Sequence, residues 1–229
     1  MKKRRGLLPV LSAGLCLLLC GCMRPVPELE EQVVVGSRSY IELSRETRER
    51  LDLAVESADG LTFAGEARCA GDQEQHKAYA YPDSRYPNLL VISIDDELRI
   101  FQLETLFGET DGLPELLAMY GLDGVNSVQT IRVSRQQSAR KAELLKEITD
   151  KAVIDAFLDG LQAERDFREG PDADAIKYEN ELWYYLNLEL SNGFTLPIKW
   201  IPSNRCIQAQ GINYQYDKKT SAWLNANIP

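Results

Sequence analysis

Histidine is almost absent from this chain, which has a single one, His76, among its 229 residues. The patterns H-x-x-H, C-x-x-C and H-E-x-x-H do not occur, so the spacings typical of zinc sites are missing. The phosphate-binding loops G-x-G-x-x-G and G-x-x-x-x-G-K-[ST] are missing too. A Ser/His/Asp or Cys/His arrangement would have to use His76, which we expect to be solvated in a polar loop. We therefore expect no metal and no cofactor.

Other patterns that could carry chemistry are incomplete. Ser138-Ala139-Arg140-Lys141 matches S-x-x-K at the expected start of a helix, and Lys219-Thr220-Ser221 is similar to the K-T-G of penicillin-binding proteins and β-lactamases. The glycine of K-T-G is missing, so we interpret Ser138 as an ordinary serine at a helix start. Asp95-Asp96-Glu97 and Asp172-Ala173-Asp174 do not match the twelve-residue calcium loop. With 35 acidic residues, a hydrolase that uses unidentified carboxylates stays an alternative.

Positive charge is scarce after the first few residues. The chain has 26 basic and 35 acidic residues, a net charge of −9. Four of the basic residues and none of the acidic ones precede position 22, so residues 22–229 carry a net charge of −13. A domain this acidic argues against nucleic acid as a partner and against adsorption to anionic lipid by charge.

Only one long apolar run occurs, and it lies at the N-terminus. Four basic residues precede about 14 mostly apolar residues from Leu7 to Cys20, which is typical of a signal peptide and short for a bilayer span. Leu19-Cys20-Gly21-Cys22 then resembles the lipobox of bacterial lipoproteins. The resemblance implies that residues 1–21 are removed and that Cys22 carries diacylglycerol and a further acyl chain such as palmitate. Two or three acyl chains hold a protein stably at a membrane. It therefore implies a lipid anchor on the extracytoplasmic face of the cell membrane.

Two cysteines follow the lipobox, Cys69 and Cys206. Outside the cytoplasm an even number of cysteines suggests a disulfide. A Cys69–Cys206 bond would join the N-terminal half of the chain to its last strands. The alternative is two separate buried thiols, because free cysteine is a common core residue.

Alternating apolar residues predict a β-hairpin over 182–201. Ser191-Asn192-Gly193 lies between its strands. A three-residue loop would pair Leu188 with Leu196 and build one continuous apolar face, whereas a two-residue loop would break that face. The three-residue loop also places Gly193 at a left-handed position.

A second hairpin is predicted over 89–103, where Asp95-Asp96-Glu97 lies between two apolar runs. The same reasoning predicts a three-residue loop, which pairs Ile94 with Leu98 and Ile92 with Ile100. Each hairpin is followed by a candidate helix.

The remaining elements predict an α+β fold, an antiparallel sheet with packed helices. The expected strands and helices are a first strand at 33–35, helices at 43–58 and 113–120, a strand at 127–133, two helices between 138 and 163 separated at Thr149-Asp150, and a helix at 221–226. The pattern of two hairpins suggests two weakly similar units. We expect a signal peptide at 1–21, a lipid-anchored tether at 22–37 and a globular domain at 38–229, with candidate halves 38–126 and 127–229.

Aromatic residues are concentrated near the C-terminus and suggest a binding surface. The predicted register turns Trp183 and Tyr185 away from the core, where they would form an aromatic platform for a glycan or peptide. Helix 150–161 or 221–226 would remove this surface if it covered that side. We therefore expect a non-catalytic binding, sensing or assembly domain of the cell envelope, with an envelope protein, peptide or glycan as partner. A solute-binding receptor for an importer is a further alternative.

Overall fold

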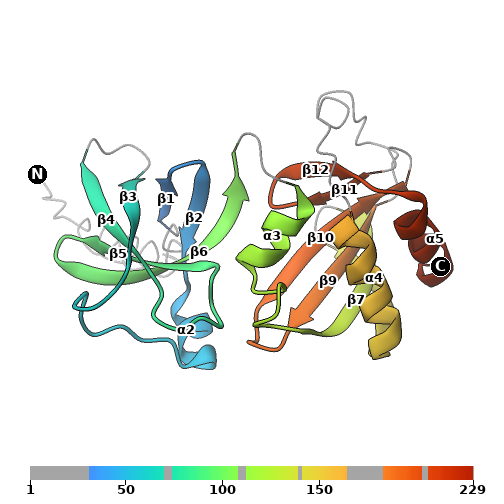
Figure 1. Ribbon diagram of the computed structural model, residues 1–229, viewed down its shortest axis with the longest axis horizontal. Helices are drawn as coiled ribbons and strands as arrows, with labels where there is room; N and C mark the ends of the chain where they lie inside the picture. Colours follow the sequence, from blue (N-terminus) through green and yellow to red (C-terminus); the bar gives the residue numbers. More distant parts are fainter. Residues whose placement is uncertain are drawn as a thin grey trace, which may run out of the picture. The chain divides into compact units, whose positions relative to one another are not determined.

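Two antiparallel sheets make up most of the described chain (Figure 1). The computed structural model describes residues 31–69, 74–107, 112–138, 141–163, 183–202 and 206–228, without the side chains of 136–138, 141, 162 and 163. The first sheet closes into a six-stranded barrel with the order β1-β2-β6-β5-β4-β3. The second is an open six-stranded sheet with the order β12-β11-β10-β9-β7-β8.

The barrel strands are β1 (Gln32–Val35), β2 (Arg38–Glu42), β3 (Phe63–Cys69), β4 (Gln75–Ala80), β5 (Leu89–Ile94) and β6 (Glu97–Leu106). The second sheet contains β7 (Val128–Ser138), β8 (Lys141–Ile148), β9 (Tyr184–Leu190), β10 (Thr195–Ile201), β11 (Cys206–Ala209) and β12 (Ile212–Gln215). The helices among the described residues are α2 (Arg45–Leu51), α3 (Leu113–Met119), α4 (Lys151–Ala163) and α5 (Lys218–Asn227). None of these helices has the length and apolar character needed to cross a membrane.

The predicted α+β fold of packed helices and two similar units is wrong. Strands predominate, and the two sheets differ in topology, since one is a closed barrel and the other is open. The first of the two helices expected between 138 and 163 is strand β8, which pairs with β7. A bulge opposite Val133 and Ser134 leaves Leu145 as an extra residue on β8. The bulge gives Leu144, Leu145 and Ile148 a spacing that a helix would also show.

The second of those helices is confirmed. It is α4, and the Asp150 carboxylate accepts a hydrogen bond from the Ala152 N–H at 2.8 Å, as a helix N-cap does. The expected helices at 113–120 and 221–226 are confirmed as α3 and α5. The expected strand at 33–35 lies within β1, and the expected strand at 127–133 overlaps β7 from Val128 onward.

The predicted hairpin over 182–201 is confirmed in its register. Leu188 pairs with Leu196, and the Leu190 N–H donates to the Phe194 carbonyl across the loop at 2.9 Å. Gly193 has a φ of +83°, the left-handed conformation that the three-residue loop requires.

The predicted register of the hairpin over 89–103 is wrong. Ile94 pairs with Glu97, so the loop has only two residues, Asp95 and Asp96. Both have positive φ, at 50° and 63°, as in a type I′ turn. Parity could not decide this register because Leu89, Leu90, Val91 and Ile92 are all buried, so both faces of β5 are covered.

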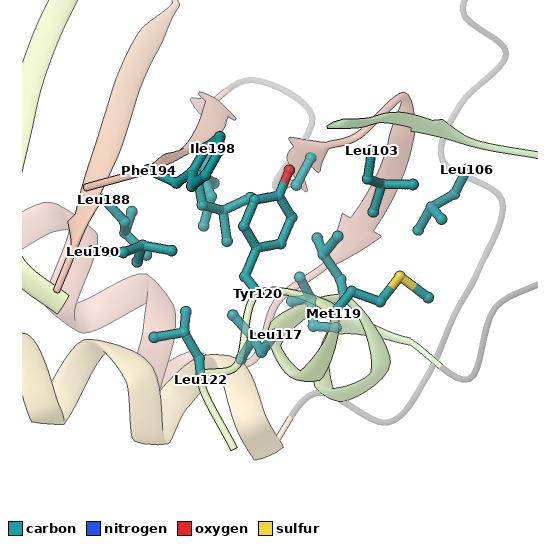
Figure 2. Close-up of a cluster of buried hydrophobic side chains, with 14 of the residues drawn as sticks. Leu103, Leu106, Leu117, Met119, Tyr120, Leu122, Leu188, Leu190, Phe194 and Ile198 are labelled. Carbon is teal, nitrogen blue, oxygen red and sulfur yellow. The ribbon is translucent and has the colours of Figure 1, made fainter. Parts of the chain in front are cut away.

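The apolar core is continuous across the barrel, the helices and the second sheet. Figure 2 shows Tyr120, which follows α3, together with Leu103 and Leu106 of the barrel and Phe194 and Ile198 of the second sheet. Phe157 of α4 stacks on Trp223 of α5 with 4.3 Å between ring centroids, within the same cluster. The described residues from Glu31 onward therefore form one compact unit.

Candidate functional site

A groove of about 810 Å³ opens at one mouth of the barrel. Its walls come from the β1–β2 turn, from β3 and from the connection between β4 and β5. Three other hollows among the described residues are smaller, at about 250, 350 and 440 Å³. The groove is therefore the largest of these four hollows.

The groove exists because β3 and β4 turn small residues toward the barrel interior. Strand pairing places Gly65 and Ala67 of β3 on the same face as Ala78 and Ala80 of β4. Side chains normally fill the interior of a small barrel. Gly65 and Ala80 line the groove, whereas Ala67 and Ala78 are fully buried in the core, so the small side chains leave space at the mouth.

Gly65 is required where it stands. Its φ is +148°, and a Cβ there would lie 3.1 Å from Val35 Cγ1 of the neighbouring strand. The position falls at a bulge between β3 and β4, which bends the strand at the mouth.

Three tyrosines line the groove: Tyr40, Tyr81 and Tyr86. Tyr40 is 5% exposed, and its burial raises the pKa of its phenol, while the neighbouring Arg38 opposes that rise. Tyr81 and Tyr86 meet edge to face, with ring centroids 5.7 Å apart and planes at 89°. Burial also raises the pKa of Tyr81, whose hydroxyl donates to the Ala54 carbonyl at 3.4 Å. Tyr40 and Tyr81 therefore stay neutral at physiological pH, and the three side chains present ring faces and hydroxyl groups.

The charged residues of the groove differ in the direction they face. Arg38 pairs with Val35 and has the same inward orientation as Val33 and Tyr40. Glu66 pairs with Lys77 on the outer face of the barrel. Asp83 is bound by Arg85 through Nε at 2.9 Å and Nη2 at 2.5 Å, and these hydrogen bonds lower the pKa of Asp83. Arg38 is therefore the one charged lining residue that strand pairing turns inward.

The loop that forms one wall is tied to the rest of the protein. Asn126 Nδ2 and Asn192 Nδ2 both donate to the Arg85 carbonyl, at 2.8 and 2.6 Å. Tyr86 contacts Phe194 edge to face with 5.8 Å between centroids. The loop from Asp83 to Tyr86 is thus held in place by side chains from two distant parts of the sequence.

The predicted aromatic surface lies on the second sheet, away from the groove. Trp183 and Tyr185 are half-buried on the face opposite the buried Tyr184 and Leu186, and α4 and α5 pack in the core on that buried side. Lys199 Nζ lies 3.3 Å from the centroid of the Trp183 ring, so a cation occupies one ring face. One face of the Trp183 ring is therefore covered by Lys199, and a binding surface at Trp183 and Tyr185 stays a prediction.

The other predicted residues do not meet at one site. Cys69 in β3 and Cys206 in β11 are buried thiols in different sheets, without a bond between them. His76 is a buried residue of β4, and the expected solvated loop position is wrong. Ser138 and Lys141 pair across the β7–β8 hairpin instead of beginning a helix. Cys22 and Asp172–Asp174 lie outside the described residues.

Sequence reasoning did not identify the groove. The signal that could have found it is the alternation of glycine and alanine at positions 65, 67, 78 and 80. In two adjacent strands, such alternation predicts an under-filled face. This alternation identifies a shared face only together with the pairing of β3 with β4.

Within the described part of the chain, no three His, Cys, Asp or Glu side chains are grouped as metal ligands. No known protein family matches the sequence, and searches of curated proteins and of solved structures found no match.

Proposed function

We propose that this chain is a lipid-anchored protein of the cell envelope that binds a small ligand at the mouth of its barrel. The groove of about 810 Å³ carries the proposal. Ligand sites commonly occupy clefts of roughly 300–1,000 Å³ and often lie in the mouths of β-barrels. The lining of this groove mixes apolar and aromatic side chains with polar ones, and placed polar groups of this kind orient a ligand in such sites.

Binding accounts for the groove better than hydrolysis does. A glycosidase-type reaction needs two carboxyl groups that face the same space. Of the two lining carboxylates, Glu66 lies on the outer face of the barrel, and Asp83 is held by Arg85. The lining residues all lie between positions 35 and 90, within the barrel, whereas an importer receptor of the two-lobed kind binds between lobes.

The anchor is tested first. Cys22→Ser should abolish incorporation of an alkyne-bearing palmitate analogue and move the protein from the membrane fraction to the soluble fraction, because the acceptor thiol is lost. Cys20→Ser is the matched control and should keep both the label and the membrane fraction. Labelled, membrane-bound Cys22→Ser protein would overturn the anchor at this position.

The groove is tested with N-phenyl-1-naphthylamine, a neutral apolar dye whose fluorescence rises on burial. In the full-length Cys22→Ser chain, the dye should bind saturably. Ala80→Leu adds an isobutyl group to the groove and should weaken dye binding about tenfold or more, because it fills the space that the ligand needs. Circular dichroism checks that this variant is folded.

The matched control is Ala142→Leu, the same change at an exposed residue of β8 in the second sheet. It should bind the dye like the parent chain. Unchanged dye affinity in a folded Ala80→Leu variant would exclude the barrel mouth as the binding site.

A further inference from the structure

The position of Arg38 bears on the chemistry of the ligand that the groove binds. Arg38 is the first residue of β2, and its pairing with Val35 turns it toward the barrel interior at the mouth. Its side chain is 41% exposed, so a ligand in the groove can reach it. An arginine turned into an apolar groove is a specific recognition group, because its fork of N–H donors matches carboxylate and phosphate oxygens.

Most of the hydrogen-bonding capacity of Arg38 remains available to such a ligand. Nη2 of Arg38 lies 3.3 Å from Glu115 Oε1 of α3, a long contact, and Arg38 also hydrogen-bonds the Tyr40 hydroxyl. A guanidinium has five N–H donors, which point in different directions. Arg38 can therefore bridge Glu115 and a ligand anion together. The Tyr40 hydroxyl beside it adds a neutral donor, since burial keeps that phenol protonated.

The acidic residues near the groove do not cancel the attraction of Arg38 for an anion. Asp83 is neutralised by its two-pronged contact with Arg85. Glu66 is exposed and faces the outer surface, opposite Lys77 in the strand register. Next to Arg38, the groove is lined by apolar residues with small side chains, Val35, Gly65 and Ala80. A polar cation would find no inward-facing carboxylate there.

We propose that the barrel mouth binds a small amphipathic anion, with a carboxylate or phosphate group on Arg38 and an apolar or aromatic body between Tyr40, Tyr81 and Tyr86. This inference rests on the proposed function, since it names the ligand class of the same groove. The anion selects the ligand through Arg38, and the body occupies the space left by the small residues of β3 and β4.

The test compares decanoate with decanol, both below their aggregation limits, as competitors of N-phenyl-1-naphthylamine in the full-length Cys22→Ser chain. The two molecules share an apolar chain and differ in the carboxylate. Decanoate should displace the dye at a concentration about tenfold or more below that of decanol, as expected for a charge-assisted hydrogen bond. Equal displacement by the two would overturn the anion preference.

Arg38→Gln should remove this difference by weakening decanoate about tenfold while decanol is unchanged. Arg38→Lys keeps the charge and should retain part of the preference, because a single ammonium cannot form the fork. The matched control is Arg132→Gln, on the second sheet, where the arginine is 49% exposed and ion-paired with Glu147 and Glu189. This control should behave like the parent chain, and a preference for decanoate that survives Arg38→Gln would overturn the role of Arg38.

The outcomes for the two proposals are distinguishable. If Ala80→Leu prevents binding but decanoate and decanol compete equally, the groove is confirmed as a site and the anion inference fails. If Ala80→Leu leaves all binding intact, the proposed function fails. Sedimentation with vesicles of phosphatidylglycerol, compared with phosphatidylcholine, tells whether the anion is a lipid headgroup. Arg38-dependent co-sedimentation with the anionic vesicles assigns that source, and displacement by decanoate alone assigns a free molecule.

Discussion

At the scale of single residues, orientation in the barrel decides what each side chain can do. Arg38 and Glu66 both lie at the mouth, yet the pleat turns Arg38 inward and Glu66 outward. Residue type alone would give the groove a net negative lining. The strand pairing changes that result, because only the inward residue, Arg38, faces a ligand in the groove.

Tyr120 provides a residue-scale prediction about pH. It is fully buried, and burial raises the pKa of its phenol above the usual value near 10, although Gln102 and Gln210 donate to the hydroxyl. A raised folded-state pKa contributes stability that is fully present below pH 10 and is lost as the pH rises further. Between pH 9.5 and 11.5, the free energy of unfolding should therefore fall less steeply with pH in Tyr120→Phe than in the wild type. The two slopes should differ by up to about 1.4 kcal/mol per pH unit.

Urea unfolding at several pH values measures this slope. Tyr120→Phe should also cost about 1 kcal/mol at pH 7, because the amide partners lose a buried acceptor. Leu117→Ala serves as the control, since it removes core packing from α3 without removing a titrating group. It should lower the free energy of unfolding by a similar amount at each pH. A wild-type slope in Tyr120→Phe would contradict the prediction.

At the scale of elements, turns set the register of strands whose two faces are both buried. The β5–β6 hairpin has Asp95 and Asp96 in its type I′ turn, both with positive φ. Aspartate tolerates this conformation less well than glycine, which pays no Cβ penalty there. The hairpin therefore forms with two aspartates in its turn, although glycine would suit the positive φ values better.

Asp96→Gly should stabilise the protein by about 0.5–1 kcal/mol, because it relieves the left-handed strain at the second turn position. Thermal and urea unfolding both measure this gain. Asp123→Gly is the control: Asp123 is an exposed turn residue without positive φ, so glycine there should only add freedom to the unfolded chain and lower stability. A loss of stability in Asp96→Gly would show that its side chain matters more than its φ.

At the scale of the whole molecule, the continuous core predicts cooperative unfolding of both sheets. The three tryptophans, Trp183, Trp200 and Trp223, all lie in or beside the second sheet, so their fluorescence reports on that sheet. Phe101 lies in the barrel and is fully buried. Phe101→Ala should lower the stability measured by tryptophan fluorescence by about 3–5 kcal/mol, because the barrel and the second sheet share one core.

Far-UV circular dichroism, recorded in parallel, should give the same unfolding midpoint as the fluorescence. Phe63→Ala is the matched control, since Phe63 is a barrel residue that is 58% exposed and should cost much less. A fluorescence transition that stays at the wild-type midpoint in Phe101→Ala, while circular dichroism shifts, would mean that the two sheets unfold independently.

Local patterns predicted much of the secondary structure. The hairpin over 182–201 was predictable because its two faces differ, so parity selects one register. The Asp150 cap and helix α4 were predictable because capping and helical spacing act within a few residues. The leader and Cys22 depend on sequence alone, and their role stays a prediction that no described residue tests.

The barrel, its groove and the direction of Arg38 were decided only by the tertiary structure. Closing β1 onto β3 pairs Val35 with Ala67, 32 positions away in sequence, and no local pattern specifies such a pairing. The bulge on β8 also gave its apolar residues a helix-like spacing in the sequence. Only the pairing with β7 shows that this segment is a strand. The sequence determined by itself the scarcity of histidine, the acidic charge, the 182–201 hairpin and the start of α4. Which small residues face one another, and hence where a ligand fits, depends on contacts between distant strands.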